Sequence, residues 1–254
     1  MIFDSHAHYD DAQFDTDREA LLASLPLKGV KKIVNIGCDL PSSQRSITLA
    51  KQYDNIYAAV GFHPENLSDV SEEALEEIRL LSRHPKVCAI GEIGLDYYYD
   101  EFAPEVQRHW FQKQLQLAWE EQKPIIVHSR EAAQDTFDLI SQSKVRRGVI
   151  HCFSSSAQMA KEYVKMGFYI GIGGVITYKN AKKLVEVVQE IPLERILIET
   201  DCPYMAPVPN RGKRNDSSNL VYVVEKIAQI KGVSPEEVAA KTFQNAENMY
   251  FGKF

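Results

Sequence analysis

Two histidines and an aspartate alternate in the stretch Asp4-Ser-His6-Ala-His8, close to the start of the chain. Because side chains at positions i and i+2 of a β-strand point to the same face, these three groups would project together. Neutral imidazoles are common ligands for metal ions. An isolated His-x-His pair is a weak signal, so its meaning depends on which other donors the chain brings to the same place.

Further donor side chains lie at the ends of other apolar, β-branched runs. They are His63 in GFHP, Glu92 in GEIG, His128 in IIVHSR, His151 in GVIHCF and Asp201 in ETD. The two remaining histidines, His84 and His109, lack this placement and are expected at the surface or in helix packing. This selective placement of five histidines and two carboxylates predicts one shared metal centre.

The elements that must position these donors are eight short β-branched runs, at residues 2–6, 31–37, 56–64, 87–96, 124–130, 148–153, 168–174 and 195–201. Segments with helical periodicity separate them, over 15–24, 42–52, 71–82, 104–121, 132–141, 157–166 and 180–190. This alternation predicts an α/β fold with a mostly parallel sheet. Eight units match a (β/α)8 TIM-like barrel better than a doubly wound sheet, which usually has fewer strands and a switch point.

Two further helices, near residues 218–231 and 234–250, are expected to close the outer ring of the barrel. No repeat, low-complexity tract or linker divides the chain, so a single domain over residues 1–254 is predicted. In such a barrel the carboxyl ends of all strands meet on one face, where active sites of this fold lie. The donors listed above would therefore converge on one cavity.

Six groups are predicted metal ligands: His6, His8, Glu92, His128, His151 and Asp201. A single catalytic zinc takes about three protein ligands, so this set fits two divalent ions. Nitrogen and oxygen donors without a thiolate suit Zn, Mn, Fe, Ni or Co, and Mg fits if carboxylates and a substrate phosphate dominate the coordination. The identity of the metal stays open.

The chemistry that this set indicates is hydrolysis, because two ions about 3.5 to 4 Å apart activate water and stabilise developing charge. Glu92 is the expected bridge between the ions, since it has two oxygens. Asp201 is expected both to bind metal and to accept the proton of the attacking water. Glu199 and Asp4, two residues before Asp201 and His6, are predicted to support the ligands. For Asp4 the predicted contact is a hydrogen bond to the second nitrogen of an imidazole.

The bulk composition is that of an ordinary globular protein, with 44% hydrophobic and 25% charged residues. A formal charge of −6 argues against broad, non-specific adhesion to nucleic acid or anionic membranes. The four cysteines form no C-x-x-C pair, which argues against a zinc ribbon or a disulfide framework. Without an export signal or an apolar run of about 18 residues, the expected location is cytoplasmic, with no membrane partner and no obligatory protein partner.

Seven motifs in order resemble the TatD family of metal-dependent DNases in the amidohydrolase superfamily: DSHAHYD, GFHPE, GEIGLDYYY, IIVHSREA, GVIHCFS, GGVITYKN and ETDCPYMAPVPNRGKRN. The resemblance runs from residue 2 to the C-terminal helix. It implies a (β/α)8 barrel, a divalent-metal centre and phosphodiester hydrolysis. It assigns metal binding to the same six residues and places His63 beside the substrate phosphate. With Glu92 and Asp201, His63 completes the predicted catalytic set.

A nuclease also needs cationic groups near its metals to bind phosphate. The candidates are Arg130, close behind His128, and Arg211, Lys213 and Arg214 in the loop after the last strand. The alternative is a solvated loop with internal ion pairs. The tyrosines Tyr97, Tyr98 and Tyr99 would stack on an unpaired base or pack over the barrel mouth.

The leading hypothesis is a divalent-metal-dependent deoxyribonuclease, an exonuclease or single-strand-acting enzyme whose substrate is DNA or another nucleic acid. The alternative is an amidohydrolase or acyl-ester hydrolase, including a D-aminoacyl-tRNA deacylase, because the same centre attacks carbonyls. A non-catalytic metal-dependent binding protein is the third hypothesis and the least favoured. Two departures from the family pattern, Ser155 and Asp216-Ser217, fall in loops and bear on substrate preference.

Overall fold

Eight parallel strands form one sheet in the computed structural model, which describes residues 1–252. In order they are β1 (Ile2–Ala7), β2 (Val30–Ile36), β3 (Ile56–Val60), β4 (Val87–Asp96), β5 (Ile125–Arg130), β6 (Gly148–Ile150), β7 (Tyr169–Ile172) and β8 (Ile196–Ile198). Each strand pairs with the next along the chain. A bridge between Ala7 and Cys202 joins β1 to the segment after β8 and closes the barrel.

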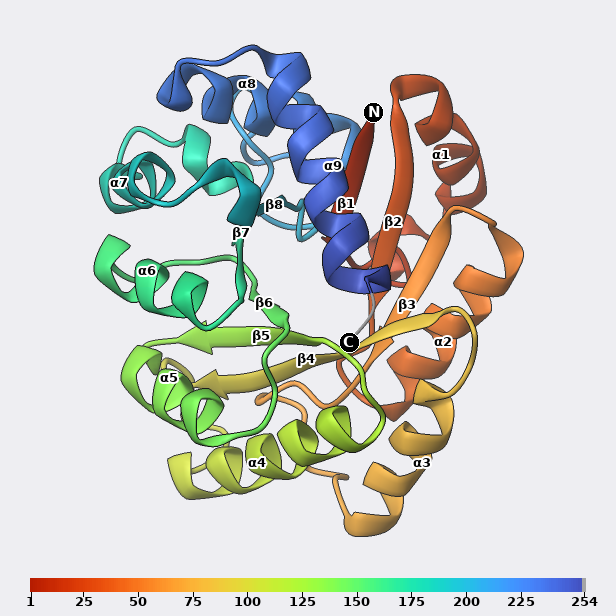
Figure 1. Cartoon of the computed structure of the whole chain (residues 1–254). Helices are drawn as coiled ribbons and strands as arrows, with labels where there is room; N and C mark the ends of the chain where they lie inside the picture. The colour runs from red at the N-terminus through yellow and green to blue at the C-terminus, as the bar shows by residue number, and fades with distance from the viewer. Residues whose placement is uncertain (253–254) are drawn as a thin grey trace.

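One helix follows each strand and the helices surround the sheet, as Figure 1 shows. They are α1 (Arg18–Ser24), α2 (Leu40–Gln52), α3 (Glu72–Ser82), α4 (Pro104–Glu120), α5 (Ala133–Gln142), α6 (Ala157–Lys165), α7 (Lys182–Glu190) and α8 (Leu220–Lys231), with α9 (Pro235–Phe251) at the end. The predicted (β/α)8 barrel with extra C-terminal helices is confirmed. Within residues 1–252, no helix combines the length and the apolar character that crossing a membrane requires.

Side-chain caps set where several helices begin. The Asp39 carboxylate accepts a hydrogen bond from the backbone N–H of Ser42 at 2.7 Å and starts α2. The last helix begins with the residues S-P-E-E, with Ser234 accepting from the N–H of Glu237 and Pro235 as the first helical residue. The start of α2 lies directly after the loop at the carboxyl end of β2, so its cap holds a loop at the barrel mouth, whereas α9 follows α8.

The interior of the barrel holds a separate apolar cluster that explains the position of α9. From the strands it takes Phe3, Val34, Ile36, Ala59, Cys88, Ala89, Ile126, Val149, Tyr169 and Leu197, and from α9 it takes Ala246, Met249 and Tyr250. The prediction that both tail helices join the outer ring is therefore wrong for α9. The inner side chains would face water at the amino ends of the strands, and α9 covers them.

Hydrogen bonds fasten α9 in this place. The Tyr250 hydroxyl donates to the carbonyl of Ser5 at 2.7 Å, and the Asn245 amide donates to the carbonyls of Leu193 and Ile196 at 2.8 Å each. Figure 1 shows α9 lying against β1, while α8 sits beside α7 in the ring. With one end of the barrel plugged, only the carboxyl ends of the strands are left to form a site.

Candidate metal centre

The predicted donors come from six of the eight strands and meet at the carboxyl end of the barrel. His6 lies in β1 and His128 in β5, and His8 and His151 directly follow β1 and β6. His63 and Asp201 lie three residues beyond β3 and β8. Glu92 differs from the expectation, because it sits within β4, which continues to Asp96. The barrel thus brings together groups that are up to 195 positions apart in sequence, from His6 to Asp201.

Glu92 is the centre of the cluster, and its two oxygens face different imidazoles. Its Oε2 lies 3.3 Å from His6 Nε2 and 3.9 Å from His8 Nε2. Its Oε1 lies 2.9 Å from His128 Nδ1, 2.8 Å from His151 Nε2 and 3.4 Å from His63 Nε2. The residue is only 4% exposed. One carboxylate therefore separates two sets of donors, which is the arrangement a bridge between two ions requires.

Asp201 joins the first of these sets. Its Oδ1 lies 3.4 Å from His8 Nε2 and 3.6 Å from His6 Nε2. The Asp201 backbone N–H donates to the carbonyl of His6 at 2.9 Å, and its φ of 55° is in the left-handed region. Such a conformation is uncommon for a non-glycine residue and is typical of functional sites. The backbone thereby turns this carboxylate toward the two histidines of β1.

Hydrogen bonds at the outer nitrogen select the tautomer of two imidazoles. His8 Nδ1 lies 3.1 Å from the carbonyl of Ile36, so Nδ1 carries the proton and the Nε2 lone pair faces Asp201 and Glu92. His128 is reversed, with Nε2 2.9 Å from Asp96 Oδ2, which leaves Nδ1 facing Glu92. Both rings thus turn their second nitrogen toward the cluster, where its lone pair can bind a metal ion once the nitrogen has lost its proton.

Asp96 is a site residue that the sequence reasoning missed. It is 1% exposed and also accepts hydrogen bonds from the backbone N–H groups of Tyr98 and Tyr99, at 2.9 and 3.3 Å. The available signal was its position at the end of a strand run, GEIGLD, matching that of Asp201 in ETD. Asp96 therefore holds both the ring of His128 and the first turn of the loop after β4.

Glu199 is buried beside His151. Its Oε1 is 3.7 Å from His151 Nδ1 and accepts a hydrogen bond from the backbone N–H of Cys152. Gly171 on β7 makes room for it, because a β-carbon there would overlap the Glu199 carboxylate. Burial raises the pKa of Glu199 to about 7.

Asp4 contacts the backbone of His6 and not its ring, so the predicted imidazole contact is wrong. Its carboxylate accepts from the His6 N–H at 3.3 Å, from the Thr200 hydroxyl at 2.7 Å and from the Ser217 hydroxyl at 2.6 Å. Burial raises its pKa to about 6. The carboxylate lies between β1 and the segment after β8, where Thr200 and Ser217 supply nearer donors than the ring does. Asp4 thus supports the backbone that carries His6 and Asp201.

The charges and protonation of the cluster side chains suit the binding of metal cations. Burial opposes ionisation of Glu92, but the imidazoles of His151, His63 and His6 hold its pKa well below the usual range. Burial and the neighbouring His151 ring, 3.9 Å away between ring centres, lower the pKa of His6 to about 4. His6 Nε2 and His8 Nε2 lie only 3.1 Å apart, and within residues 1–252 His6 Nδ1 has no hydrogen-bond partner. Converging lone pairs beside buried carboxylates are the donor set of a divalent metal centre.

The cationic candidates have different environments. Arg214 forms a two-pronged ion pair with Asp17, at 2.8 and 2.6 Å, and lies over the Phe14 ring, which favours the internal ion-pair alternative for this residue. Arg211 is exposed and lies 4.5 Å from the Tyr178 ring, and Lys213 is exposed. Arg130 is half-buried with its guanidinium 3.8 Å from the Tyr98 ring.

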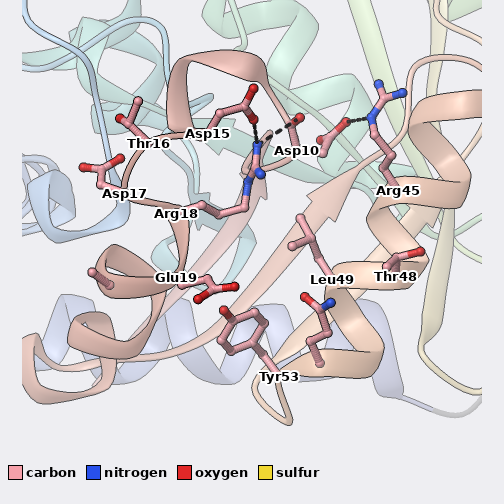
Figure 2. A pocket seen from close by; sticks show the side chains of 12 residues that line it. Asp10, Asp15, Thr16, Asp17, Arg18, Glu19, Arg45, Thr48, Leu49 and Tyr53 are labelled. Atoms are coloured by element: carbon pink, nitrogen blue, oxygen red, sulfur yellow. Dashed lines mark hydrogen bonds and ion pairs between the residues drawn. The ribbon is translucent and has the colours of Figure 1, made fainter.

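A hollow of about 580 Å³ between α1 and α2 lies apart from this centre, and Figure 2 shows the side chains that line it. None of the metal donors borders it. Its two arginines have partners in the chain, since Arg18 donates to the carbonyl of Tyr9 at 2.6 Å and Arg45 pairs with Asp10 at 3.3 Å. The hollow supplies no group to the hydrolytic chemistry.

Comparisons with known proteins place the chain among similar barrels. The TatD related DNase family matches residues 3–251. The uncharacterized metal-dependent hydrolase YabD of Bacillus subtilis is 45% identical over 98% of this chain and 99% of its own length. The 3'-5' ssDNA/RNA exonuclease TatD of Salmonella typhimurium is 34% identical over 98% of both chains. The solved structure of YjjV, a TatD homologue from Escherichia coli K12, matches with a TM-score of 0.93 and 34% identity, over 98% of this chain and 97% of its own.

Proposed function

The chain belongs to the TatD-related DNase family of metal-dependent hydrolases, and on that premise we propose that it hydrolyses phosphodiester bonds of DNA, at an end or within a single strand. The observation that carries the proposal is the position of the Glu92 carboxylate, whose two oxygens face two separate sets of imidazoles. The nuclease activity named for the Salmonella relative supports the choice of a phosphodiester substrate.

In this proposal Glu92 would help to hold two divalent ions. His6, His8 and Asp201 would complete one position, and His128 and His151 would complete the other. The bound ions would supply an activated water and stabilise the charge that develops on the phosphate. Asp201 would accept a proton from that water, because its carboxylate is held ionised. Burial raises its pKa, but the hydrogen bond from His8 and the charge of His151 outweigh burial and bring the pKa below its ordinary value.

His63 has a different part in the proposal. Its Nδ1 accepts a hydrogen bond from the backbone N–H of Glu65 at 3.2 Å, so Nε2 carries the proton. The ring therefore presents a donor to the site where His8 and His128 present lone pairs. A donor 3.4 Å from Glu92 Oε1 suits a phosphate oxygen held beside the bridge. Arg130 is a candidate to bind a neighbouring phosphate. Arg211 and Lys213 are candidates to bind phosphates farther along the bound nucleic acid.

Hydrolysis of a carbonyl, as in an amidohydrolase or a D-aminoacyl-tRNA deacylase, uses the same donors and is the competing outcome. The cationic Arg130 favours phosphate, because its half-buried guanidinium lies on the Tyr98 ring two residues beyond His128. A carbonyl substrate offers no charge for such a group to bind.

The test is turnover of one oligonucleotide, labelled at either end, across Mg, Mn, Zn, Ni and Co, with a chelated control and a parallel panel of amides and esters. We expect metal-dependent cleavage of the oligonucleotide, and loss of both cleavage and metal content in Glu92→Gln. His84→Ala is the matched control and should keep parental turnover, since His84 lies outside the cluster. Turnover of an amide or ester with no cleavage of any oligonucleotide would assign the competing chemistry.

A further inference from the structure

Two exposed aromatic rings and one arginine stand together at the barrel mouth beside the metal centre. Tyr98 and Tyr99 are 57% and 49% exposed, which is unusual for large apolar side chains. Their rings meet edge to face with centres 4.9 Å apart, and the Arg130 guanidinium lies 3.8 Å from the centre of the Tyr98 ring. Tyr97 is excluded from this group, because its hydroxyl donates to Asp135 at 2.7 Å and the side chain is packed.

The same residues that orient the metal donors build this cluster. Asp96 pairs with Arg130 in the register of β4 and β5, and its carboxylate contacts the ring of His128. The other oxygen of Asp96 accepts from the N–H groups of Tyr98 and Tyr99. Arg130 follows His128 by two residues, which is about 7 Å along a strand and on the same face. The two rings and the Arg130 cation are therefore held at a defined place, two residues beyond His128 along β5.

The chemistry of this cluster matches one unpaired nucleotide. An arginine stacked by its plane on an aromatic ring keeps its N–H groups free at the edge, where they bind a phosphate oxygen. An exposed tyrosine face stacks on a base, but only on a base that is not already stacked in a duplex. Arg130 also interacts with the Tyr99 side chain and with the charge of Asp96, which hold the guanidinium in place and leave others of its five N–H groups for an anion.

We propose that Tyr98, Tyr99 and Arg130 form a binding site for one unpaired nucleotide next to the phosphodiester that is cleaved, with its phosphate on Arg130 and its base on a tyrosine ring. The inference rests on the proposed nuclease function and adds to it the residues that select an unstacked base. It also gives Tyr98 and Tyr99 a role that Tyr97, the first tyrosine of the motif GLDYYY, does not share.

The test measures binding without turnover. The affinity of the protein for a short fluorescent oligothymidylate is followed by anisotropy in chelator, for the parent and for the pair Tyr98→Leu with Tyr99→Leu. Stacking of one base accounts for roughly 5- to 150-fold in affinity, so the leucine pair should bind weaker by a factor in that range. The pair Tyr98→Phe with Tyr99→Phe keeps both rings and should restore binding. Trp119→Leu removes another exposed aromatic, 46% exposed near the end of α4, and should bind like the parent.

A second arm identifies the stacked base. Oligonucleotides with an abasic residue at successive positions should lose affinity for the parent at one position, and the leucine pair should be insensitive to that same replacement. Equal thermal melting of all variants is the folding control. Parental affinity in the leucine pair, or an equal loss on normal and abasic strands, overturns the inference. Failure of the parent to cleave any oligonucleotide, with the binding effects intact, overturns the proposed nuclease function and leaves the nucleotide site standing.

Discussion

His128 lies between two carboxylates of the same strand. Glu92 Oε1 is 2.9 Å from its Nδ1, and Asp96 Oδ2 is 2.9 Å from its Nε2. Burial lowers its pKa, but these two hydrogen bonds outweigh burial and raise the pKa to about 9. A proton therefore occupies this ring at neutral pH when no cation competes for Nδ1. At the scale of single residues, two imidazoles have a hydrogen-bond partner behind them, Asp96 for His128 and the Ile36 carbonyl for His8. Glu199 lies behind His151, with its Oε1 3.7 Å from Nδ1.

Asp201→Asn tests the role of the carboxylate that we assign to proton acceptance. Asparagine keeps the size and one oxygen but lacks the charge and the basic site. The loss of a general base typically slows a reaction by about 10²- to 10⁴-fold, so turnover should fall by at least that factor. Thermal stability should change little, because the side chain borders the open end of the barrel.

The measurement is single-turnover cleavage together with elemental analysis of bound metal. A parental rate in Asp201→Asn at full metal occupancy would exclude the assigned role and direct the proton to His63 or to solvent. A lower rate with lower occupancy would reflect ligation, which is why both quantities are needed.

At the scale of elements, the longest strand, β4, has a glycine where it lies close to the backbone of β5. β4 has 10 residues, and Gly94 within it has a φ of 146°, a conformation that favours glycine. A β-carbon at this position would overlap the carbonyl of His128 on β5. The close approach of β4 to β5 lets Glu92 and Asp96 reach the two sides of the His128 ring.

Gly94→Ala should therefore destabilise the fold and disturb the site together. Gly212→Ala is the matched control, since Gly212 also has a positive φ, 85°, but no atom within 4 Å of an added β-carbon. The control should cost about 1 kcal/mol from backbone conformation alone, and Gly94→Ala should cost at least about 1 kcal/mol more. Denaturant unfolding gives the two free energies. Equal values for the two variants would mean that β4 and β5 do not need this close approach.

At the scale of the whole molecule, six strands contribute to one cluster that exists only in the folded chain. Divalent ions that bind the cluster should stabilise the fold, because the unfolded chain has no such site. Imidazoles must be neutral to bind, so binding depends on pH. His128 gives an interval with defined limits, since its pKa is raised from 6.5 to about 9, and the pKa values of His8 and His151 are raised as well.

The stability of the metal-free protein should thus depend on pH more strongly than that of the metal-loaded protein. A histidine with a raised pKa stabilises the fold fully below its unfolded pKa and loses that contribution as pH rises through its folded pKa. The melting temperature of chelated protein should fall between pH 6.5 and 9. The difference between metal-loaded and chelated protein should widen over the same interval, because metal no longer displaces a proton.

Thermal melting at several pH values, with and without chelator, checks both statements. A glutamine at position 128 has no proton to lose in this interval, so the melting temperature of His128→Gln in chelator should fall less steeply with pH. A constant difference between loaded and chelated protein across the interval would contradict the linkage.

The sequence by itself determined the barrel and the set of donors. Strand and helix periods are local patterns, and each of His6, Glu92, His128 and Asp201 is marked by its place in an apolar run. Once eight such runs alternate with helices, the rule that strand ends meet on one face brings the donors together. No long-range contact had to be known for either step.

Tertiary structure alone decided which partners those donors have. Arg214 pairs with Asp17 across 197 positions, and Tyr250 of α9 reaches Ser5 across 245. Asp96 contacts His128 only because β4 continues past Glu92 beside β5. Periodicity along the chain carries no information about such pairs, since it specifies which face a side chain is on and not what lies opposite. Distances of a few ångströms between distant segments decide whether a charge is neutralised inside the protein or is left for a substrate.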